Sequence, residues 1–211
     1  MSNALGSERE LREEIVLQGR SLFDRGLTAG SSGNLSIRLP DGILITPTNS
    51  CLGRLQPDDI ARLDSVGNHQ SGLPPSKEAF LHQSYFRSRD REHAVVHLHS
   101  TWSVAVSCLR DLDPENALPA ITPYFVMRVG RLPLIPYFPP GDRGLAEAVA
   151  ETALTAKAIL LANHGPVIGG VDLHRAVDAI EELEETAKLF LMLRGLPTQF
   201  LTEEQTKALS S

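Results

Sequence analysis

The sequence has little cysteine: Cys51 and Cys108 are the only two among 211 residues. They form no CxxC pair, so a cysteine-type zinc site is excluded and nothing suggests a disulfide framework. Apolar runs are also short, and none approaches the roughly 20 residues that a membrane-spanning helix needs. No apolar stretch near the N-terminus indicates a secretion signal. We therefore expect a cytoplasmic enzyme or binding protein.

The sequence has fewer basic than acidic residues: it contains 20 Lys and Arg residues and 26 Asp and Glu residues, so the net charge is −6. No long basic block is present, which argues against nucleic acid or an anionic membrane as the main partner. A local basic pocket could still hold an anionic small molecule. The rest of the composition, 42% apolar and 22% charged, is typical of a chain that buries one core.

Helices and strands are mixed along the whole chain. A capping box at Ser7 and Glu10 predicts a first helix that ends at Gly26. Periodicity and turn signals predict strands at 35–39, 43–46, 94–98, 132–137 and 158–162, and helices at 76–88, 101–109, 145–156, between Asp172 and Gly195, and from Thr202. We therefore expect one α/β domain over residues 1–211, with a central, mostly antiparallel sheet flanked by helices on both sides.

Two histidines, His97 and His99, end the apolar run in AVVHLHSTW. Side chains two residues apart on a strand lie on one face, roughly 6.6 Å apart along it. Both imidazoles could then tilt onto one cation, with Zn–N bonds of about 2.0–2.1 Å. The alternative is a pair of unrelated histidines at a sheet edge.

His164, in LLANHGPV, is a third candidate ligand. It follows an apolar strand and precedes Gly165-Pro166, where we expect a tight bend from which a histidine can project. An ordinary hydrogen-bonded turn histidine is the alternative. Three histidines with an open coordination position are typical of catalytic zinc. The remaining histidines are expected to be surface or packing residues: His69, His82, His93 and His174.

Glu78 is the candidate carboxylate, either as a fourth ligand or as the acid/base. It is expected in the first turn of a helix, where its alternative role is a favourable interaction with the helix dipole.

Three short stretches of small polar residues could hold an anion. Residues 31–34 (SSGN) and 46–50 (TPTNS) offer closely spaced N–H groups and hydroxyls. Ser76 and Lys77 are expected at a helix N-terminus, which favours negative charge. Each stretch could also be an ordinary turn. None matches the P-loop pattern, so nucleotide binding is not supported.

Five motifs in chain order, GSSGNLS, ITPT, PPSKE, AVVHLHSTW and LLANHG, resemble those of the class II aldolase family. That family includes fuculose-phosphate aldolase, ribulose-phosphate 4-epimerase and the adducin head domain. The resemblance covers nearly the whole chain. Within the family, the chain is most similar to the 3-oxo-tetronate 4-phosphate decarboxylases, on the stretches PSKE, HLHSTWSVAVSCL, TPYFVMRVG, PPGD and IEELEETAKL.

The resemblance implies a role for each candidate site residue. The zinc ligands correspond to His97, His99 and His164. Glu78 corresponds to a glutamate that binds the metal in the resting site and serves as acid/base. The phosphate-binding positions correspond to Gly33, Asn34, Thr48, Asn49, Ser76 and Lys77.

Two of these positions depart from the aldolase pattern, because Asn49 replaces a usual glycine and Lys77 replaces a serine. Tyr124 lies near the place where aldolases use a catalytic tyrosine from a neighbouring subunit.

The implied reaction is zinc-dependent decarboxylation of a 3-oxo-tetronate 4-phosphate to dihydroxyacetone phosphate and CO₂, through a metal-stabilised enediolate. The implied cofactor is one Zn²⁺ per chain. A sugar-phosphate aldolase of the fuculose-phosphate type is the alternative, since it forms the same enediolate. An epimerase would need further acid/base groups, and an adducin-like module would not need the histidine set.

The resemblance also implies a homotetramer with four-fold cyclic symmetry. The aromatic-rich residues 122–140 could form its interface or could fill the core of the monomer.

Overall fold

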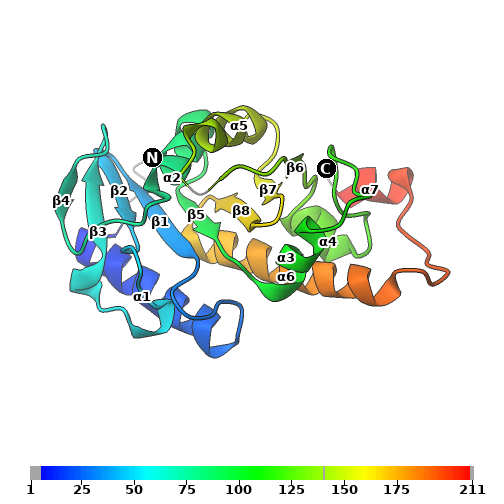
Figure 1. Ribbon diagram of the computed structural model, residues 1–211, viewed down its shortest axis with the longest axis horizontal. Helices are drawn as coiled ribbons and strands as arrows, with labels where there is room; N and C mark the ends of the chain where they lie inside the picture. Colours follow the sequence, from blue (N-terminus) through cyan, green and yellow to red (C-terminus); the bar gives the residue numbers. More distant parts are fainter. Residues whose placement is uncertain (1–5, 140, 210–211) are drawn as a thin grey trace.

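The computed structural model describes residues 6–139 and 141–209, which leaves Pro140 of the PPGD stretch outside. One sheet runs through the molecule, formed by β1 (Asn34–Leu39), β2 (Gly42–Ile45), β3 (Ala61–Asp64), β4 (His69–Ser71), β5 (Ala94–His97), β6 (Leu134–Ile135), β7 (Ala158–Leu161) and β8 (Gly165–Gly170). The strand order is β4-β3-β2-β1-β5-β8-β7-β6 (Figure 1). Only β6 and β7 pair in parallel within the described residues.

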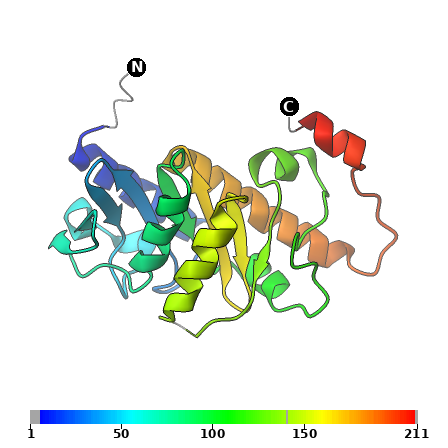
Figure 2. The same ribbon diagram turned by 90° about the horizontal axis from the view of Figure 1, so that it is seen from above.

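Helices cover both faces of this sheet. They are α1 (Glu8–Asp24), α2 (Ala79–Ser88), α3 (Thr101–Ser107), α4 (Pro123–Arg128), α5 (Arg143–Ala153), α6 (Leu173–Leu193) and α7 (Glu203–Leu209), with short 3-10 turns at η1 (Leu52–Arg54) and η2 (Pro57–Asp59). Figure 1 shows α2 and α5 on one face and α1 and α6 on the other, and Figure 2 shows α2 and α5 in front of the strands with α6 behind. The expected α/β fold with a mostly antiparallel sheet is confirmed. None of the helices in the described ranges combines the length and apolar character needed to cross a membrane.

Alternation along the strands decides which side chains reach α2. Val95 of β5 belongs to the core cluster that includes α2 and α5, whereas Val96 belongs to the cluster that includes α1 and α6. Because successive strand residues face opposite sides, His97 lies on the α2 side with Val95. By the same alternation Asn34 and Ser36 of β1 face α2, and both lie within hydrogen-bonding distance of side chains from the α2 segment.

The expected tight bend at Gly165-Pro166 is wrong, because these residues begin β8, which pairs with both β5 and β7. The sequence GPVIGG conceals this strand, since glycine and proline are both unfavourable inside a sheet. The structure explains one of these glycines by close packing. A Cβ atom at Gly169 would lie 2.2 Å from the Tyr85 hydroxyl oxygen of α2.

Three further elements, β3, β4 and α4, are not predicted from the sequence. β3 and β4 contain four and three residues, and all three residues of β4 are exposed. Strands this short carry too little apolar alternation to be recognised. α4 begins at Pro123 after Thr122, whose hydroxyl accepts the Phe125 N–H at 3.1 Å. A cap and an N-terminal proline are helix signals, but the helix that they begin has only six residues, the proline included.

Glu184 of α6 caps the N-terminus of α3. Its buried carboxylate accepts the N–H groups of Trp102 and Ser103 at 2.7 and 2.8 Å and the Ser103 hydroxyl at 2.6 Å. The first N–H groups of a helix have no partner within that helix, and negative charge is favourable there. This contact therefore fixes the start of α3, immediately downstream of His99.

Replacing this cap should destabilise the protein. Glu184→Ala should lower the free energy of unfolding by ~2–4 kcal/mol, because buried N–H groups and a hydroxyl lose their acceptor. Glu185→Ala is the matched control. Its carboxylate is exposed and lies 3.9 Å from Lys188, so its effect should stay within about 0.5 kcal/mol. Urea unfolding measures both variants, and equal losses would contradict the capping role.

Candidate metal centre

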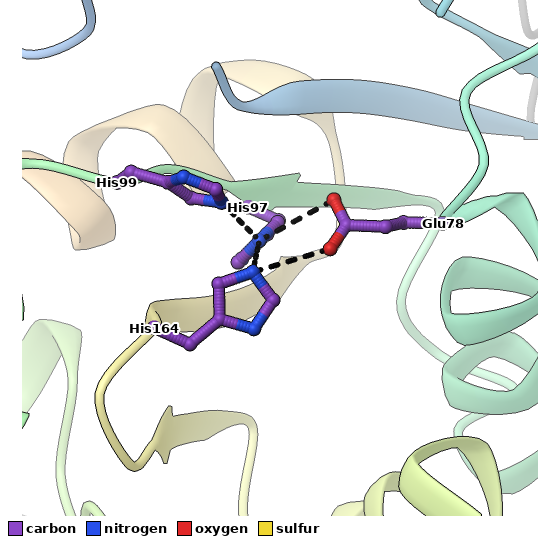
Figure 3. A group of neighbouring side chains, drawn as sticks. All are labelled: Glu78, His97, His99 and His164. Carbon is purple, nitrogen blue, oxygen red and sulfur yellow. Dashed lines mark hydrogen bonds and ion pairs between the residues drawn. The ribbon is translucent and has the colours of Figure 1, made fainter. Parts of the chain in front are cut away.

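Four side chains converge where β5 ends: Glu78, His97, His99 and His164. Figure 3 shows the three imidazole rings pointing toward one another, with the Glu78 carboxylate entering from the side of α2. The four potential ligand atoms all lie within 4.8 Å of one another. The Nε2 atom of His97 lies 3.0 Å from that of His99 and 3.3 Å from that of His164. These donors come from three separate segments of the chain.

His97 is the buried member of the cluster, with no exposed surface. Its Nδ1 atom lies 2.8 Å from the carbonyl oxygen of Pro166 in the neighbouring strand β8. A carbonyl oxygen can only accept, so Nδ1 carries the hydrogen and Nε2 of the neutral ring presents a lone pair. Since Nε2 is the atom that faces the other donors, this arrangement fits a metal ligand whose second nitrogen is fixed by an acceptor.

His164 occupies the turn between β7 and β8. Asn163 before it has a left-handed φ of 57°, a conformation that asparagine tolerates better than most residues. Gly165 after it has a φ of 142°, and a Cβ atom there would lie 2.4 Å from the carbonyl oxygen of Leu98. A larger residue at 165 would therefore separate His164 from the segment that carries His97 and His99.

Glu78 lies just before α2, which begins at Ala79, so the expected place in the first helical turn is wrong by one residue. Its side chain does not cap the helix. Instead, Oε1 lies 3.2 Å from Nε2 of His164 and Oε2 lies 3.5 Å from Nε2 of His97. The Asn34 amide donates to Oε2 at 2.6 Å. The helix-dipole alternative is thus not the role of this carboxylate.

The electrostatic environment gives the cluster the protonation state that a metal requires. Burial raises the pKa of the Glu78 carboxyl, but the nearby His97 and the contacts with His164 and Asn34 outweigh it, and the pKa lies well below its ordinary value. Burial lowers the pKa of His97 to about 4 and also lowers that of His99. Near pH 7 the carboxylate is therefore ionised and these two imidazoles are neutral, as metal ligands must be.

A pocket of about 360 Å³ opens beside this cluster. Glu78, His99 and His164 form part of its wall. The six expected phosphate-binding residues form another part: Gly33, Asn34, Thr48, Asn49, Ser76 and Lys77. The structure therefore brings the small polar loops next to the candidate metal ligands.

Two of the pocket residues, Asn49 and Lys77, are the ones that depart from the aldolase pattern. Asn49 has a left-handed φ of 53°, a conformation that glycine adopts readily and asparagine tolerates better than most residues, so asparagine can stand where glycine is usual. Lys77 is the one lysine or arginine that lines the pocket among the residues described.

Tyr124 lies elsewhere, 60% exposed on α4, and is not among the residues that line this pocket within the described chain. Its expected role involves a neighbouring subunit and stays a prediction.

The structure adds two residues to the surroundings of the site. Gly141, in the PPGD stretch, lines the pocket, a role that is not predicted for it from the sequence. His82, expected to be a surface or packing residue, is fully buried and bonds to Asn34. Its spacing of four residues from Glu78, typical of one helix face, is the signal that could have linked the two.

Comparisons with known proteins agree with this arrangement. The Class II Aldolase and Adducin N-terminal domain matches residues 13–191. The chain is 49% identical over 212 residues to the 3-oxo-tetronate 4-phosphate decarboxylase of Escherichia coli K12, with 100% of both chains covered. It is 36% identical over 200 residues to the L-fuculose phosphate aldolase of Haemophilus influenzae, covering 93% of this chain and 90% of the other.

A solved structure has the same fold. The crystal structure of YgbL from Escherichia coli superposes with a TM-score of 0.95 at 47% identity, covering 98% of this chain and 100% of that one.

Removing one imidazole should abolish stable metal binding. His99→Ala and His164→Ala should each weaken zinc binding by more than roughly 100-fold, beyond the effect of losing an outer-shell partner. His69→Ala is the control, because His69 lies in the exposed strand β4. Metal content after zinc loading and dialysis measures binding, and circular dichroism checks the fold. Full zinc retention in both site variants would contradict the assignment.

Proposed function

The chain belongs to the class II aldolase and adducin family, and on that premise we propose that it is a zinc-dependent carbon–carbon lyase that decarboxylates a 3-oxo-tetronate 4-phosphate. The observation that carries this proposal is the cluster of three histidines and one glutamate at the wall of a pocket lined by small polar loops and Lys77. A relative that is 49% identical over the full length is named for the same reaction.

Glu78, His97, His99 and His164 would hold the zinc ion. Imidazole nitrogen and carboxylate oxygen are ordinary zinc donors, and three histidines beside an accessible pocket are typical of catalytic sites. When bound, the ion supplies Lewis-acid stabilisation of negative charge on the oxygen atoms of the substrate.

The chemistry follows from the position of the substrate carboxylate, which is β to the ketone. When the C1–C2 bond breaks, CO₂ leaves and the electron pair remains on C2 and the C3 oxygen as an enediolate. One proton on C2 then completes dihydroxyacetone phosphate. The ionised Glu78 carboxylate lines the pocket, where it can hold the water molecule that supplies this proton or relay the proton itself.

The polar loops would bind the other end of the substrate. Residues 31–34 and 47–49 line the pocket, and Lys77 contributes a positive charge. Small-residue turns and a cation are suited to a phosphate group. Phosphate binding at a fixed distance from the metal ligands orients the carboxylate for departure, so binding energy contributes to the rate.

A sugar-phosphate aldolase of the fuculose-phosphate type is the second candidate. It is supported by the aldolase relative at 36% identity, and cleavage to an aldehyde leaves the same enediolate. The metal ligands and phosphate loops therefore suit both reactions.

The decarboxylase proposal predicts a defined product ratio. The zinc-loaded protein should release one CO₂ for each dihydroxyacetone phosphate formed from a 3-oxo-tetronate 4-phosphate, with coupled assays measuring each product. Aldehyde release from fuculose 1-phosphate, with no CO₂ from the acid, would instead assign the aldolase.

Lys77→Ala provides an internal check on this assay. It should lower kcat/KM for the phosphorylated acid by ~10- to 100-fold, the scale of a hydrogen bond to a charged group, without changing zinc content. Arg87→Ala is the matched control, since Arg87 lines the neighbouring groove between α2 and α5 but not the metal-site pocket. Equal activity on the unphosphorylated acid would contradict the anion site.

We further propose a homotetramer with four-fold cyclic symmetry, in which Tyr124 completes the pocket of a neighbouring subunit. Phe125 fills the core, but Tyr124, Met127 and Tyr137 are 60%, 54% and 60% exposed. Aromatic and methionine side chains that are exposed on a single subunit are typical of the surfaces that become interface cores on assembly. Light scattering at micromolar protein should give the mass of four 23.0 kDa chains. A fully active monomer would contradict both the ring and the shared site.

A further inference from the structure

A chain of hydrogen bonds connects the sheet to the carboxylate of the candidate metal centre. His82 lies on α2, four residues after Glu78, and has no exposed surface. Its Nδ1 atom lies 2.7 Å from the Ser36 hydroxyl oxygen, and its Nε2 atom bonds with Oδ1 of Asn34. The Nδ2 group of Asn34 donates to Oε2 of Glu78 at 2.6 Å. The order is therefore Ser36, His82, Asn34 and Glu78.

The chemistry of the last link sets the direction of every other one. An ionised carboxylate can only accept, so Asn34 must present its Nδ2 donor to Glu78. The Oδ1 atom of Asn34 then faces His82 and must accept, so Nε2 of His82 carries the hydrogen. In the neutral ring Nδ1 is then the acceptor, and the Ser36 hydroxyl donates to it. One arrangement of hydrogens satisfies all four side chains.

The neutral ring is also the form that its surroundings favour. Burial lowers the pKa of His82 to about 3; the nearby His97 lowers it further, and Glu78 opposes both effects. Both ring nitrogens of His82 thus make hydrogen bonds in one fixed tautomer. A histidine that only filled space in the core would not need a particular tautomer.

Glu78 needs such support because its own backbone does not fix its carboxylate. The residue lies just before α2, its side chain makes no capping hydrogen bond, and the side chain is 23% exposed toward the pocket. Asn34 is nearly buried at the start of β1 and holds Oε2, and His82 in turn holds the Asn34 amide.

We propose that His82 is a positioning residue which, through Asn34, fixes the orientation of the Glu78 carboxylate toward His97 and His164. This inference rests on the proposed metal centre but not on the proposed reaction. A histidine that only tied α2 to β1 would contribute to stability and leave metal affinity unchanged.

The tautomer of His82 tests the direction of the chain in the metal-free protein. Long-range ¹H–¹⁵N spectra of the histidine-labelled protein, with the His82 signals assigned from their loss in His82→Gln, should show hydrogen on Nε2 and none on Nδ1. A hydrogen on Nδ1 would reverse the direction of the hydrogen bonds that His82 makes with Ser36 and Asn34, and would overturn the proposal.

Zinc affinity, measured by competition with a chromophoric chelator, tests the positioning role without substrate. His82→Leu removes the donor to Asn34 and should weaken zinc binding by ~10- to 100-fold, the usual effect of losing an outer-shell partner. His82→Gln keeps an N–H donor near the position of Nε2 and should restore most of the affinity.

Tyr85→Phe is the matched control on the same helix. It removes another buried hydrogen bond of α2, from the Tyr85 hydroxyl to the Lys157 carbonyl at 2.8 Å, and should lower the melting temperature with zinc affinity unchanged. Wild-type affinity in His82→Leu, or an equal loss of affinity in Tyr85→Phe, would overturn the positioning role. If His82→Leu does not fold, the same decision falls to His82→Gln: near-wild-type affinity supports the role, and a 10-fold or greater loss overturns it.

Discussion

The hydrogen bond from Nδ1 of His97 to the Pro166 carbonyl oxygen is the interaction on which the site depends. It joins β5 to β8, and it leaves the Nε2 lone pair of a fully buried imidazole facing the other donors. The same strand β8 begins at Gly165, immediately after His164. One strand pairing therefore orients His97 and brings His164 to it, so the geometry of the candidate metal centre follows from the sheet.

The fourth candidate ligand, Glu78, comes from the residue just before α2, on the face of the sheet that this helix covers. The alternation of β1 places Asn34 and Ser36 toward this helix, where they meet Glu78 and His82. Burying four polar side chains is favourable only if each has a hydrogen-bond partner. The series of hydrogen bonds from Ser36 through His82 and Asn34 to Glu78 gives each of them one. Core packing and site geometry are thus set by the same contacts, and the resulting pocket has the candidate metal ligands at one wall and small polar loops at another.

Much of this arrangement could be predicted from the sequence, because it depends on local rules. The spacing of His97 and His99 follows from the two-residue period of a strand, and the sheet with helices on both faces follows from patterning. β8 could not be predicted, since two of its glycines are required by residues far upstream: the Leu98 carbonyl approaches Gly165, and the Tyr85 side chain of α2 approaches Gly169. The four-residue spacing suggests that His82 and Glu78 lie close together, but the hydrogen bonds that join them could not be predicted, because Asn34, which bridges them, lies more than 40 residues upstream.

The central claim is that three imidazoles and one carboxylate form a single zinc centre, and X-ray absorption at the zinc edge of the reconstituted protein tests it most directly. The account predicts a first shell of nitrogen and oxygen donors, with three imidazole nitrogens at about 2.0–2.1 Å and the multiple-scattering signature of imidazole. In His99→Ala, any zinc that still binds should show fewer imidazoles. A shell dominated by water oxygen, or one that contains sulfur from Cys51 or Cys108, would contradict the account.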